Sequence, residues 1–270
     1  MDPIVSIIIP TFNRAHTLER AIQSLIDQTY RYWECLVVDD FSQDSTKELV
    51  FSIADKESRI QYFENIEKGS NPARNLGLKK SKGNYVVFLD SDDALEPRMI
   101  EESLDIIEKT RQADLAISYT NIFKNGSLSM VSDLVRSENL LLDFLIKKIT
   151  WPLNSALIRK DFLISNHIKF RPNLLNGQDY CFFLSIISNK PKIVFTNKAL
   201  SVNYHLDGEP KNVKISAGDT MEYKWSRFRS RNLAFEIAFR HLSIFEFFEF
   251  IPYFTKYQTG LILDMVKSRF

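Results

Sequence analysis

Apolar and polar positions in the first half of the chain alternate between strand-like runs and helix-like segments. Short runs rich in β-branched residues fall at Val5 to Ile9, Cys35 to Val38, Ile60 to Phe63 and Tyr85 to Leu89. Between them, apolar residues recur every three or four positions, as on the buried face of a helix. Strands that alternate with amphipathic helices are typical of βαβ units, so the pattern predicts an α/β fold with a mainly parallel sheet.

The predicted helices are indicated by apolar residues that share one face and by residues typical of helix N-termini. Residues 15–28 place Leu18, Ile22, Leu25 and Ile26 on one face, and residues 45–56 form a second predicted helix. Asn71-Pro72 predicts the start of a third helix, with Asn71 as N-cap and Pro72 in the first turn. A fourth predicted helix begins at Pro97.

The second half of the chain is less regular. A strand at Leu115 to Tyr119, a turn at Asn125-Gly126, and helices near 138–148 and from Asp179 to Ser188 are predicted. From Asp219 onward the sequence has helical character and is rich in phenylalanine and tyrosine. Neither an internal repeat nor a linker is visible, so we expect one fused domain with a helical C-terminal extension.

Composition and charge exclude several classes of protein. The chain has 270 residues, of which 44% are hydrophobic and 26% charged, as in soluble globular proteins. A net charge of +1 provides no global field that would attract nucleic acid. The longest apolar runs are far shorter than a membrane span, and the first residues lack a basic segment followed by an apolar one. We therefore expect a cytoplasmic protein, with Cys35 and Cys181 as buried free thiols.

Polar side chains follow three of the predicted strands. Pro10 to Arg14 follow the first, Asp39-Asp40 the second, and Asp90-Ser91-Asp92-Asp93 the fourth. Because ligands bind beyond the carboxyl ends of parallel strands, we expect these residues to gather at one edge of the sheet. A divalent cation is the simplest reason for several carboxylates to share a place. The alternative is that these aspartates merely cap turns.

Glycine-based phosphate sites are excluded by the sequence. Among only eight glycines there is no GxGxxG and no GxxxxGK[ST], and GxSxG and HExxH are also missing. The charge of a bound nucleotide would have to be met by a metal ion and by cationic side chains.

Five motifs in order resemble family 2 glycosyltransferases of the GT-A fold. They are Val5 to Asn13 (VSIIIPTFN), Val37 to Asp40 (VVDD), Ala73 to Gly77 (ARNLG), Gly83 to Asp93 (GNYVVFLDSDD) and Gly177 to Asp179 (GQD). The resemblance is close over residues 4–95 and looser to about residue 206. It implies a Rossmann-like central sheet flanked by helices, with residues 1–215 as the glycosyltransferase domain. Residues 1–95 would be its nucleotide-binding half, 96–215 its acceptor half, and 216–270 the aromatic-rich helical extension.

The same resemblance implies an inverting transfer of a sugar from a nucleoside diphosphate sugar, with a UDP-sugar favoured, to an acceptor hydroxyl. Mn²⁺ or Mg²⁺ would neutralise the leaving diphosphate. Asp92 would ligate the metal, with Asp90 at the ribose or the metal, and His205 would complete the metal or diphosphate site. The implied acceptor is a saccharide or lipid-linked saccharide, in the synthesis of surface polysaccharide or glycan, and no nucleic acid is involved.

The implied nucleotide contacts come from the strand ends. Asp39 matches the carboxylate that accepts the N3–H of uracil, and its alternative role is to cap the turn at residues 42–45. The remaining implied contacts are Pro10, Thr11, Asn13, Arg74 and Ser91. For Arg74 the alternative is a surface salt bridge.

Asp179 is the candidate general base that takes the proton of the acceptor hydroxyl. The alternative is a helix N-cap, and Gln178 stands where the family pattern usually has Glu. Trp151, Asn154 and Ser155 fall where the acceptor side of the pocket is expected, although Trp151 is equally well suited to core packing.

Basic residues at Lys224, Arg227, Arg229 and Arg231, followed by phenylalanines, suggest a peripheral membrane contact, whereas Glu236, Glu246 and Glu249 oppose it. Packing in the core or in a homodimer is the alternative for these helices. Alternative functions are a haloacid-dehalogenase-type phosphatase, a nucleotidyltransferase, and a sugar-nucleotide-binding or scaffold protein without turnover.

Overall fold

The fold is seen in a computed structural model, which describes residues 4–110, 113–124, 126–130, 137–205 and 221–267. Of Met130, His205, Met221 and residues 260–267 only the backbone is described. Two compact units are present. Unit 1 holds residues 1–132, 152–170 and 191–207, and unit 2 holds residues 133–151, 171–190 and 208–270. The predicted boundary between residues 215 and 216 remains a prediction.

Unit 1 is built on a mixed nine-stranded sheet with the order β3-β2-β1-β4-β8-β6-β9-β5, in which β7 pairs with β6. Its strands are β1 (Val5–Thr11), β2 (Trp33–Asp39), β3 (Ile60–Glu64), β4 (Tyr85–Phe88), β5 (Ala94–Leu95), β6 (Leu115–Lys124), β7 (Ser127–Met130), β8 (Ala156–Arg159) and β9 (Ile193–His205). The first four strands are mutually parallel, which confirms the predicted parallel sheet. Antiparallel pairs then join β8 to β4 and to β6.

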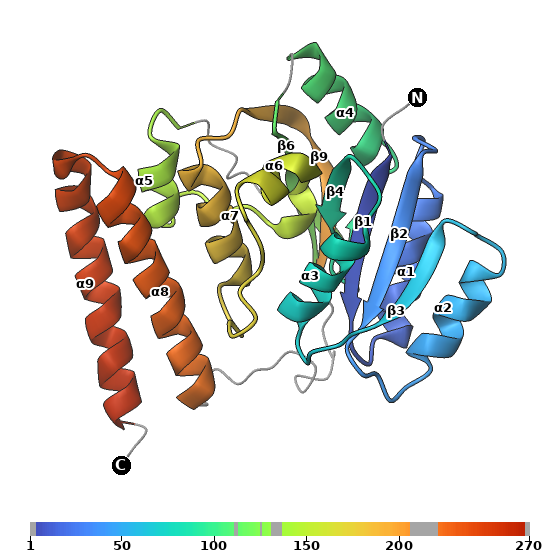
Figure 1. The fold of residues 1–270 in the computed structure, drawn as a ribbon, viewed down its shortest axis with the longest axis horizontal. Helices are drawn as coiled ribbons and strands as arrows, with labels where there is room; N and C mark the ends of the chain where they lie inside the picture. The colour runs from blue at the N-terminus through green and yellow to red at the C-terminus, as the bar shows by residue number, and fades with distance from the viewer. Residues whose placement is uncertain (1–3, 111–112, 125, 131–136, 206–220, 268–270) are drawn as a thin grey trace. The chain divides into compact units, whose positions relative to one another are not determined.

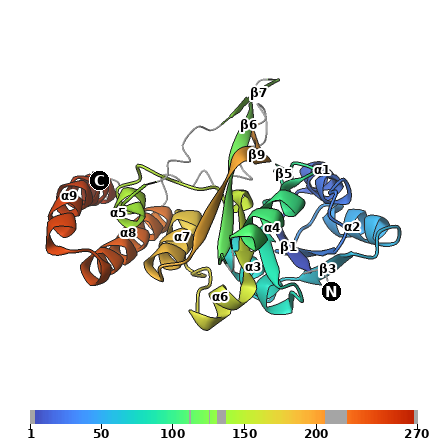
Figure 2. The same ribbon diagram turned by 90° about the horizontal axis from the view of Figure 1, so that it is seen from above.

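Helices cover both faces of this sheet (Figures 1 and 2). Those of unit 1 are α1 (Ala15–Ile26), α2 (Thr46–Ala54), α3 (Ser70–Lys80), α4 (Met99–Lys109) and α6 (Lys160–Ser165), with the short helix η1 (Leu153–Ser155). Val5, Ile7 and Ile9 of β1 join the core formed with α1 and α4, because alternate residues of a strand share a face. Ile8 faces the opposite way, toward α3.

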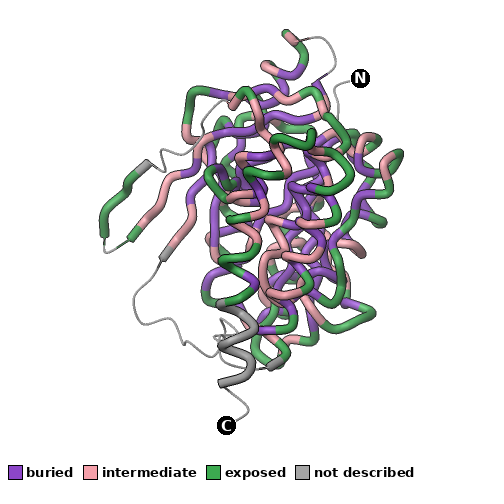
Figure 3. Tube along the Cα trace, turned by 90° about the vertical axis from the view of Figure 1, so that its left-hand side faces the viewer, coloured by how far each residue is buried: buried purple, intermediate pink, exposed green. Residues whose placement is uncertain are grey.

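The third helix begins two residues earlier than predicted. Gly69 is its N-cap, at φ 122°, and the predicted N-cap Asn71 lies inside the first turn, where it is buried. The fourth helix begins at Met99, two residues later than the predicted start at Pro97. Beyond the sheet core, the β6–β7 hairpin projects with exposed residues (Figure 3).

Unit 2 is helical. Its elements are α5 (Leu140–Leu145), α7 (Gln178–Ser188), α8 (Met221–His241) and α9 (Ile244–Lys267). The predicted helices near 138–148 and 179–188 and the helical character of the C-terminal segment are confirmed. Helices α8 and α9 run antiparallel and side by side (Figures 1 and 2). Within the described residues, none of the helices combines the length and the apolar composition that a membrane crossing requires.

The two cysteines are free and buried, as predicted. Burial raises the pKa of both thiols, most strongly for Cys35, so neither is a nucleophile near neutral pH.

Candidate functional site

The carboxyl ends of β2, β1 and β4 meet at one edge of the sheet in unit 1. Thr11 and Asp39 are direct partners in the β1–β2 register, and β4 lies on the other side of β1. The three polar segments predicted to converge therefore do so. Asp39 lies two strands from the end of β4, a lateral separation of about 10 Å at the usual strand spacing.

Asp90, Asp92 and Asp93 form an acidic cluster directly after β4. Each offers a carboxylate oxygen, and the three oxygens lie within 4.8 Å of one another. Two oxygens that bind the same divalent cation from opposite sides are separated by nearly this distance. Small side-chain rotations would therefore let the three carboxylates bind one cation. An all-oxygen donor set suits Mg²⁺ or Mn²⁺. The cluster thus fits the metal that the sequence analysis inferred.

Two arginines neutralise this cluster. Arg74 donates from Nη2 to Oδ1 of Asp90 at 2.6 Å, and Arg14 Nη1 lies 3.5 Å from Oδ2 of Asp92. Arg20 donates to the backbone carbonyl of Asp92 at 2.6 Å. The contacts of Arg14 and Arg20 were missed by sequence reasoning. Arg14 stood in the polar segment after β1 and was identifiable there, whereas nothing in the helix-period pattern distinguishes Arg20.

Asp93 is the buried member of the cluster and connects it to β9. Its carboxylate accepts hydrogen bonds from the backbone N–H of Tyr204 at 3.1 Å and from Nδ2 of Asn154 at 3.3 Å. Burial, reinforced by the negative charges of Asp90 and Asp92, raises the pKa of Asp93 to about 9. A cation bound between these three carboxylates would offset their mutual repulsion.

The two elements that donate hydrogen bonds to Asp93, η1 and β9, carry three further predicted residues. His205 ends β9 directly after Tyr204, and its side chain lies outside the described part of the chain. Asn154 is buried, and its Oδ1 atom has no hydrogen-bond partner among the described residues. Ser155 is also buried, and its hydroxyl donates to the carbonyl of Pro152.

Asp39 is held by three hydrogen bonds. Ser42 donates from its backbone N–H at 3.0 Å and from its hydroxyl at 2.5 Å, both to Oδ1, and Tyr62 donates its hydroxyl to Oδ2 at 2.7 Å. The turn-capping role that was the alternative for Asp39 is therefore present. A carboxylate has about four acceptor positions, so capacity for a further donor remains.

The loop after β1 is tied to the loop after β2. Asn13, at φ 51°, receives a hydrogen bond from Gln43 N–H at its Oδ1 and donates its own backbone N–H to the Ser42 hydroxyl. Pro10 and Thr11 are buried in β1, and the hydroxyl of Thr11 has no partner among the described residues. Phe12 and Phe41 are exposed on these loops. Exposed aromatic rings offer stacking faces for a base, and sequence reasoning did not single them out.

The position of Arg74 depends on Gly77, one turn further along α3. A β-carbon at Gly77 would lie 2.4 Å from Cγ2 of the buried Ile8. The glycine therefore lets α3 approach β1 closely, and this approach brings Arg74 to the strand ends. Arg74 is 5% exposed and also lies over the ring of Phe170 at 5.2 Å. The salt bridge considered as the alternative for Arg74 is present, and it joins a buried guanidinium to the partly exposed carboxylate of Asp90.

The candidate base Asp179 lies in unit 2, in the first turn of α7. Gly177, in the left-handed conformation at φ 71°, is the N-cap of this helix, so Asp179 is not the cap. Trp151 is 3% exposed and packs edge-on against Phe144 and Phe183. The core-packing alternative for Trp151 is therefore the one that the structure supports.

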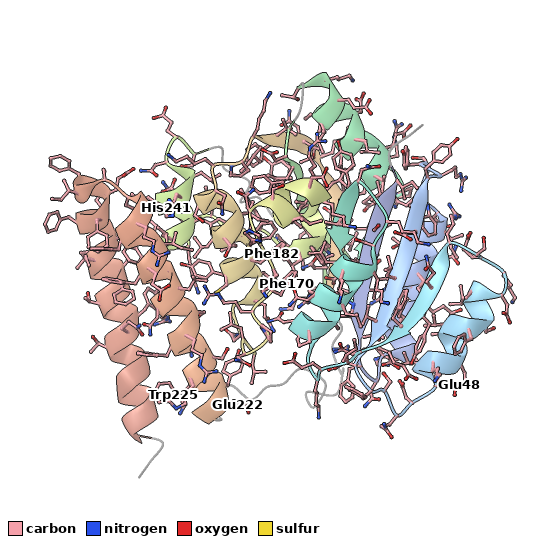
Figure 4. All side chains as sticks on the ribbon, in the orientation of Figure 1. Glu48, Phe170, Phe182, Glu222, Trp225 and His241 are labelled. Atoms are coloured by element: carbon pink, nitrogen blue, oxygen red, sulfur yellow. The ribbon has the colours of Figure 1, made fainter. Side chains whose placement is uncertain are left out.

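The aromatic residues of α8 and α9 divide into two sets. Phe235 packs against Phe247 and Phe254, and Phe250 is 1% exposed. A second set around the turn between the helices is exposed: Phe239 (71%), Phe245 (81%) and Phe248 (68%), together with the aliphatic Ile244 (67%). Figure 4 labels His241, the last residue of α8, at this turn. The first set therefore packs within unit 2, between α8 and α9, while packing against the sheet or in a homodimer stays a prediction.

Comparison with known proteins agrees with this geometry. The model of the family described as glycosyl transferase family 2 matches residues 6–166. The chain is 32% identical over 189 residues to WfgD of Escherichia coli, named UDP-Glc:alpha-D-GlcNAc-diphosphoundecaprenol beta-1,3-glucosyltransferase. That match covers 70% of this chain and 71% of WfgD.

Other relatives are longer. The chain is 34% identical over 201 residues to an uncharacterized glycosyltransferase of Rickettsia felis, covering 74% of this chain and 33% of the relative. It spans only 27–33% of the length of three such rickettsial relatives. Among solved structures, S. aureus TarS 1-349 in complex with UDP superposes with a TM-score of 0.71 at 19% identity, covering 93% of this chain and 70% of the TarS 1-349 chain. This likeness confirms the expected GT-A fold.

Proposed function

Because the chain belongs to glycosyl transferase family 2, we propose that it transfers a sugar from a nucleoside diphosphate sugar to an acceptor hydroxyl, with inversion at the anomeric carbon. The observation that carries the proposal is the cluster of Asp90, Asp92 and Asp93 at the carboxyl end of β4. This cluster lies at the same sheet edge as Asp39 and Thr11, where ligands of open α/β sheets bind.

In this proposal Asp92, with Asp90, holds Mn²⁺ or Mg²⁺, and His205 adds a ligand from the end of β9. The metal, when bound, supplies Lewis-acid stabilisation of the leaving diphosphate. Arg14 and Arg74 contact the carboxylates of Asp92 and Asp90. When a metal binds these carboxylates, the two guanidinium groups would be free to bind phosphate oxygens of the nucleotide.

The nucleotide would be held at the ends of β1 and β2. Asp39 accepts the N3–H of uracil, which favours a UDP-sugar, while Pro10, Thr11, Asn13 and Ser91 complete the base and ribose site. The unsatisfied hydroxyl of Thr11 and the exposed ring of Phe12 support this assignment. The free acceptor capacity of Asp39 supports it as well.

We assign the role of general base to Asp179. The GQD motif at residues 177–179 supports the assignment, and the finding that Asp179 is not the N-cap removes its simplest structural explanation. In this role, the Asp179 carboxylate would take the acceptor proton as the glycosidic bond forms.

The acceptor is proposed to be a lipid-linked saccharide, as the name of WfgD states for that relative. The exposed apolar turn between α8 and α9 supports a peripheral membrane contact at which such an acceptor would be met. Arg240, exposed near the end of α8, favours an anionic surface, whereas the exposed Glu236 and Glu249 weaken that attraction. A homodimer through these helices is the competing outcome.

Two experiments test this proposal. A screen of UDP-, GDP- and dTDP-sugars with Mn²⁺, read out as released nucleoside diphosphate, identifies the donor, and we expect UDP-sugars to be turned over. Calorimetry with UDP and Mn²⁺ then compares Asp92→Asn, Asp179→Asn and Asp105→Asn. The last is a matched control, because Asp105 pairs with Lys109 on the exposed face of α4.

We expect Asp92→Asn to abolish metal-dependent UDP binding, and Asp179→Asn to retain binding but lose transfer. Asp105→Asn should behave as the unaltered protein. Unchanged UDP affinity in Asp92→Asn would contradict the metal assignment, and full transfer by Asp179→Asn would contradict its role as base.

A further inference from the structure

One face of α8 carries polar residues that pack on the segment before α7. Tyr223, Ser226 and Ser230 are spaced three and four positions apart, so they share one face of the helix. Ser226 is 1% exposed and Ser230 6% exposed. The buried face of a helix is ordinarily apolar, and polar groups buried there need hydrogen-bond partners. The partners of Tyr223 and Ser226 lie in residues 173–177, the lead-in segment of α7, which belongs with α8 to unit 2.

Ser226 binds two consecutive backbone N–H groups of the lead-in segment. Its Oγ atom accepts from the N–H of Leu175 at 2.8 Å and from that of Asn176 at 3.1 Å. The hydroxyl of Tyr223 accepts a further hydrogen bond from Nδ2 of Asn176. Both N–H groups come immediately before Gly177, the N-cap of α7. Side chains of α8 therefore hold the chain at the point where it enters α7.

The N-terminus of α7 depends on this support. As a glycine, Gly177 offers no side chain that would accept a capping hydrogen bond, and its φ of 71° lies in the left-handed region. Ser230 Oγ lies 3.4 Å from the position that a β-carbon at Gly177 would take, so the turn into α7 is made directly against α8. Asp179 is the second residue of the helix that begins there. The position of the Asp179 backbone is therefore set from α8.

We propose that Ser226 is a positioning residue for Asp179, so that α8 takes part in transfer by holding the candidate base in place. This inference rests on the proposed function, in which Asp179 takes the proton of the acceptor hydroxyl. A base acts only within hydrogen-bond reach of that proton, and a misplacement of about 1 Å lowers the rate strongly. The family model ends at residue 166, before both residues.

The test compares Ser226→Ala with Ser226→Thr, which keeps a hydroxyl, and with the control Ile237→Val. The control removes one buried carbon atom from α8 about three helical turns beyond Ser226. Transfer by the full chain is measured as UDP released from UDP-glucose and from UDP-N-acetylglucosamine, with Mn²⁺ and with octyl glucoside as the acceptor. Hydrogen exchange of the Leu175 and Asn176 amides, calorimetry with UDP and Mn²⁺, and thermal unfolding are measured for each variant.

We expect Ser226→Ala to lower kcat about tenfold or more, because the first turn of α7 is no longer held against α8. The donor KM and the affinity for UDP with Mn²⁺ should be unchanged, since the proposed nucleotide and metal ligands belong to unit 1. The amides of Leu175 and Asn176 should exchange about tenfold faster. Ser226→Thr should regain most of kcat, and Ile237→Val should lower the Tm while kcat is retained.

Three results would overturn the role of Ser226. Unchanged exchange in Ser226→Ala would show that its hydroxyl does not hold the lead-in segment. Unchanged kcat in spite of faster exchange would show that the segment does not position the base. A loss of kcat in Ile237→Val as large as that in Ser226→Ala would show that both residues only support the fold of unit 2.

The proposed function fails on different results. It fails if the unaltered chain turns over neither donor, and hydrogen exchange then still decides whether Ser226 holds the lead-in segment. If Asp179→Asn loses transfer and Ser226→Ala retains it, only the role of Ser226 is contradicted.

Tyr223→Phe is the second variant, for use if Ser226→Ala does not fold. Tyr223 is half-buried, and the substitution removes only the acceptor of the Asn176 side chain. We expect a smaller fall in kcat than in Ser226→Ala, again with the donor KM unchanged. An unchanged kcat in Tyr223→Phe would then contradict the role of α8.

Discussion

Arg74 and Asp90 form an ion pair at 2.6 Å at the mouth of the acidic cluster, between the first turns of α3 and the end of β4. The arginine side chain is buried, while that of Asp90 is 40% exposed. The same carboxylate is proposed to approach a divalent cation, so guanidinium and metal compete for it. Removal of the Arg74 guanidinium should therefore raise the affinity for the metal and lower the affinity for the nucleotide.

Arg74→Gln is therefore expected to raise the affinity for Mn²⁺ in the absence of nucleotide. The ion pair is partly exposed and worth up to about 1 kcal/mol, which corresponds to roughly a fivefold gain. UDP affinity in the presence of Mn²⁺ should fall, because a cation is lost from the phosphate site. Calorimetry with Mn²⁺ alone and then with UDP measures both, and Arg59→Gln, which removes a cation paired with Glu57 elsewhere in unit 1, serves as the control. A fall in Mn²⁺ affinity would show that the two cations do not compete.

Gly77→Ala is expected to destabilise unit 1, because the new β-carbon would meet Ile8 at 2.4 Å. Overpacking of this kind costs about 1–3 kcal/mol in the free energy of unfolding. Since Arg74 lies on the same helix, UDP binding should weaken as well. Urea unfolding of Gly77→Ala, compared with that of the unaltered chain, measures the first effect. Equal stability of Gly77→Ala and the unaltered chain would show that α3 shifts freely on the sheet.

The two sets of aromatic residues in α8 and α9 should respond oppositely to substitution. Replacing Phe239, Phe245 and Phe248 together by serine should leave the Tm nearly unchanged and reduce partitioning onto anionic vesicles more than tenfold, because three exposed rings lose their apolar contact. Phe250→Ala should instead cost about 3–5 kcal/mol of stability, since that ring is fully buried. Vesicle flotation and thermal unfolding measure the two effects. Unchanged flotation of the triple variant, with a change from dimer to monomer in sedimentation, would favour the homodimer.

Glu57 predicts a pH dependence of stability in unit 1. Hydrogen bonds from Arg59, at 2.6 and 2.8 Å, lower the pKa of the Glu57 carboxyl below its usual value of 4.5. The folded state thus binds the proton less well than the unfolded state. The stabilisation is present above the unfolded pKa and is lost as the pH falls through the folded pKa. The difference in Tm between the unaltered chain and Glu57→Gln should be largest near neutral pH and shrink below about pH 4. A difference that stays constant with pH would exclude the ionised pair as its cause.

The sequence by itself determined the elements of the first half and where their chemistry lies. Val5 to Ile9 and Tyr85 to Leu89 are apolar enough to be strands in almost any setting, and aspartates directly after such strands must lie at the carboxyl edge of a parallel sheet. The acidic cluster, the free thiols and the helical C-terminal segment follow from similarly local or short-range rules. These features were predicted because each depends on residues close together in the chain.

The tertiary structure decided the features that depend on long-range packing. The order of β8, β6 and β9, the contact of Arg14 with Asp92, and the division of the tail phenylalanines into buried and exposed sets join residues distant in sequence. Gly69 replaced Asn71 as N-cap because the backbone N–H of Gly69 is bound by the Asp40 carboxylate, a partner from another strand end. Periodicity reports which face of an element is apolar, but the partner of that face is selected only when distant segments pack together.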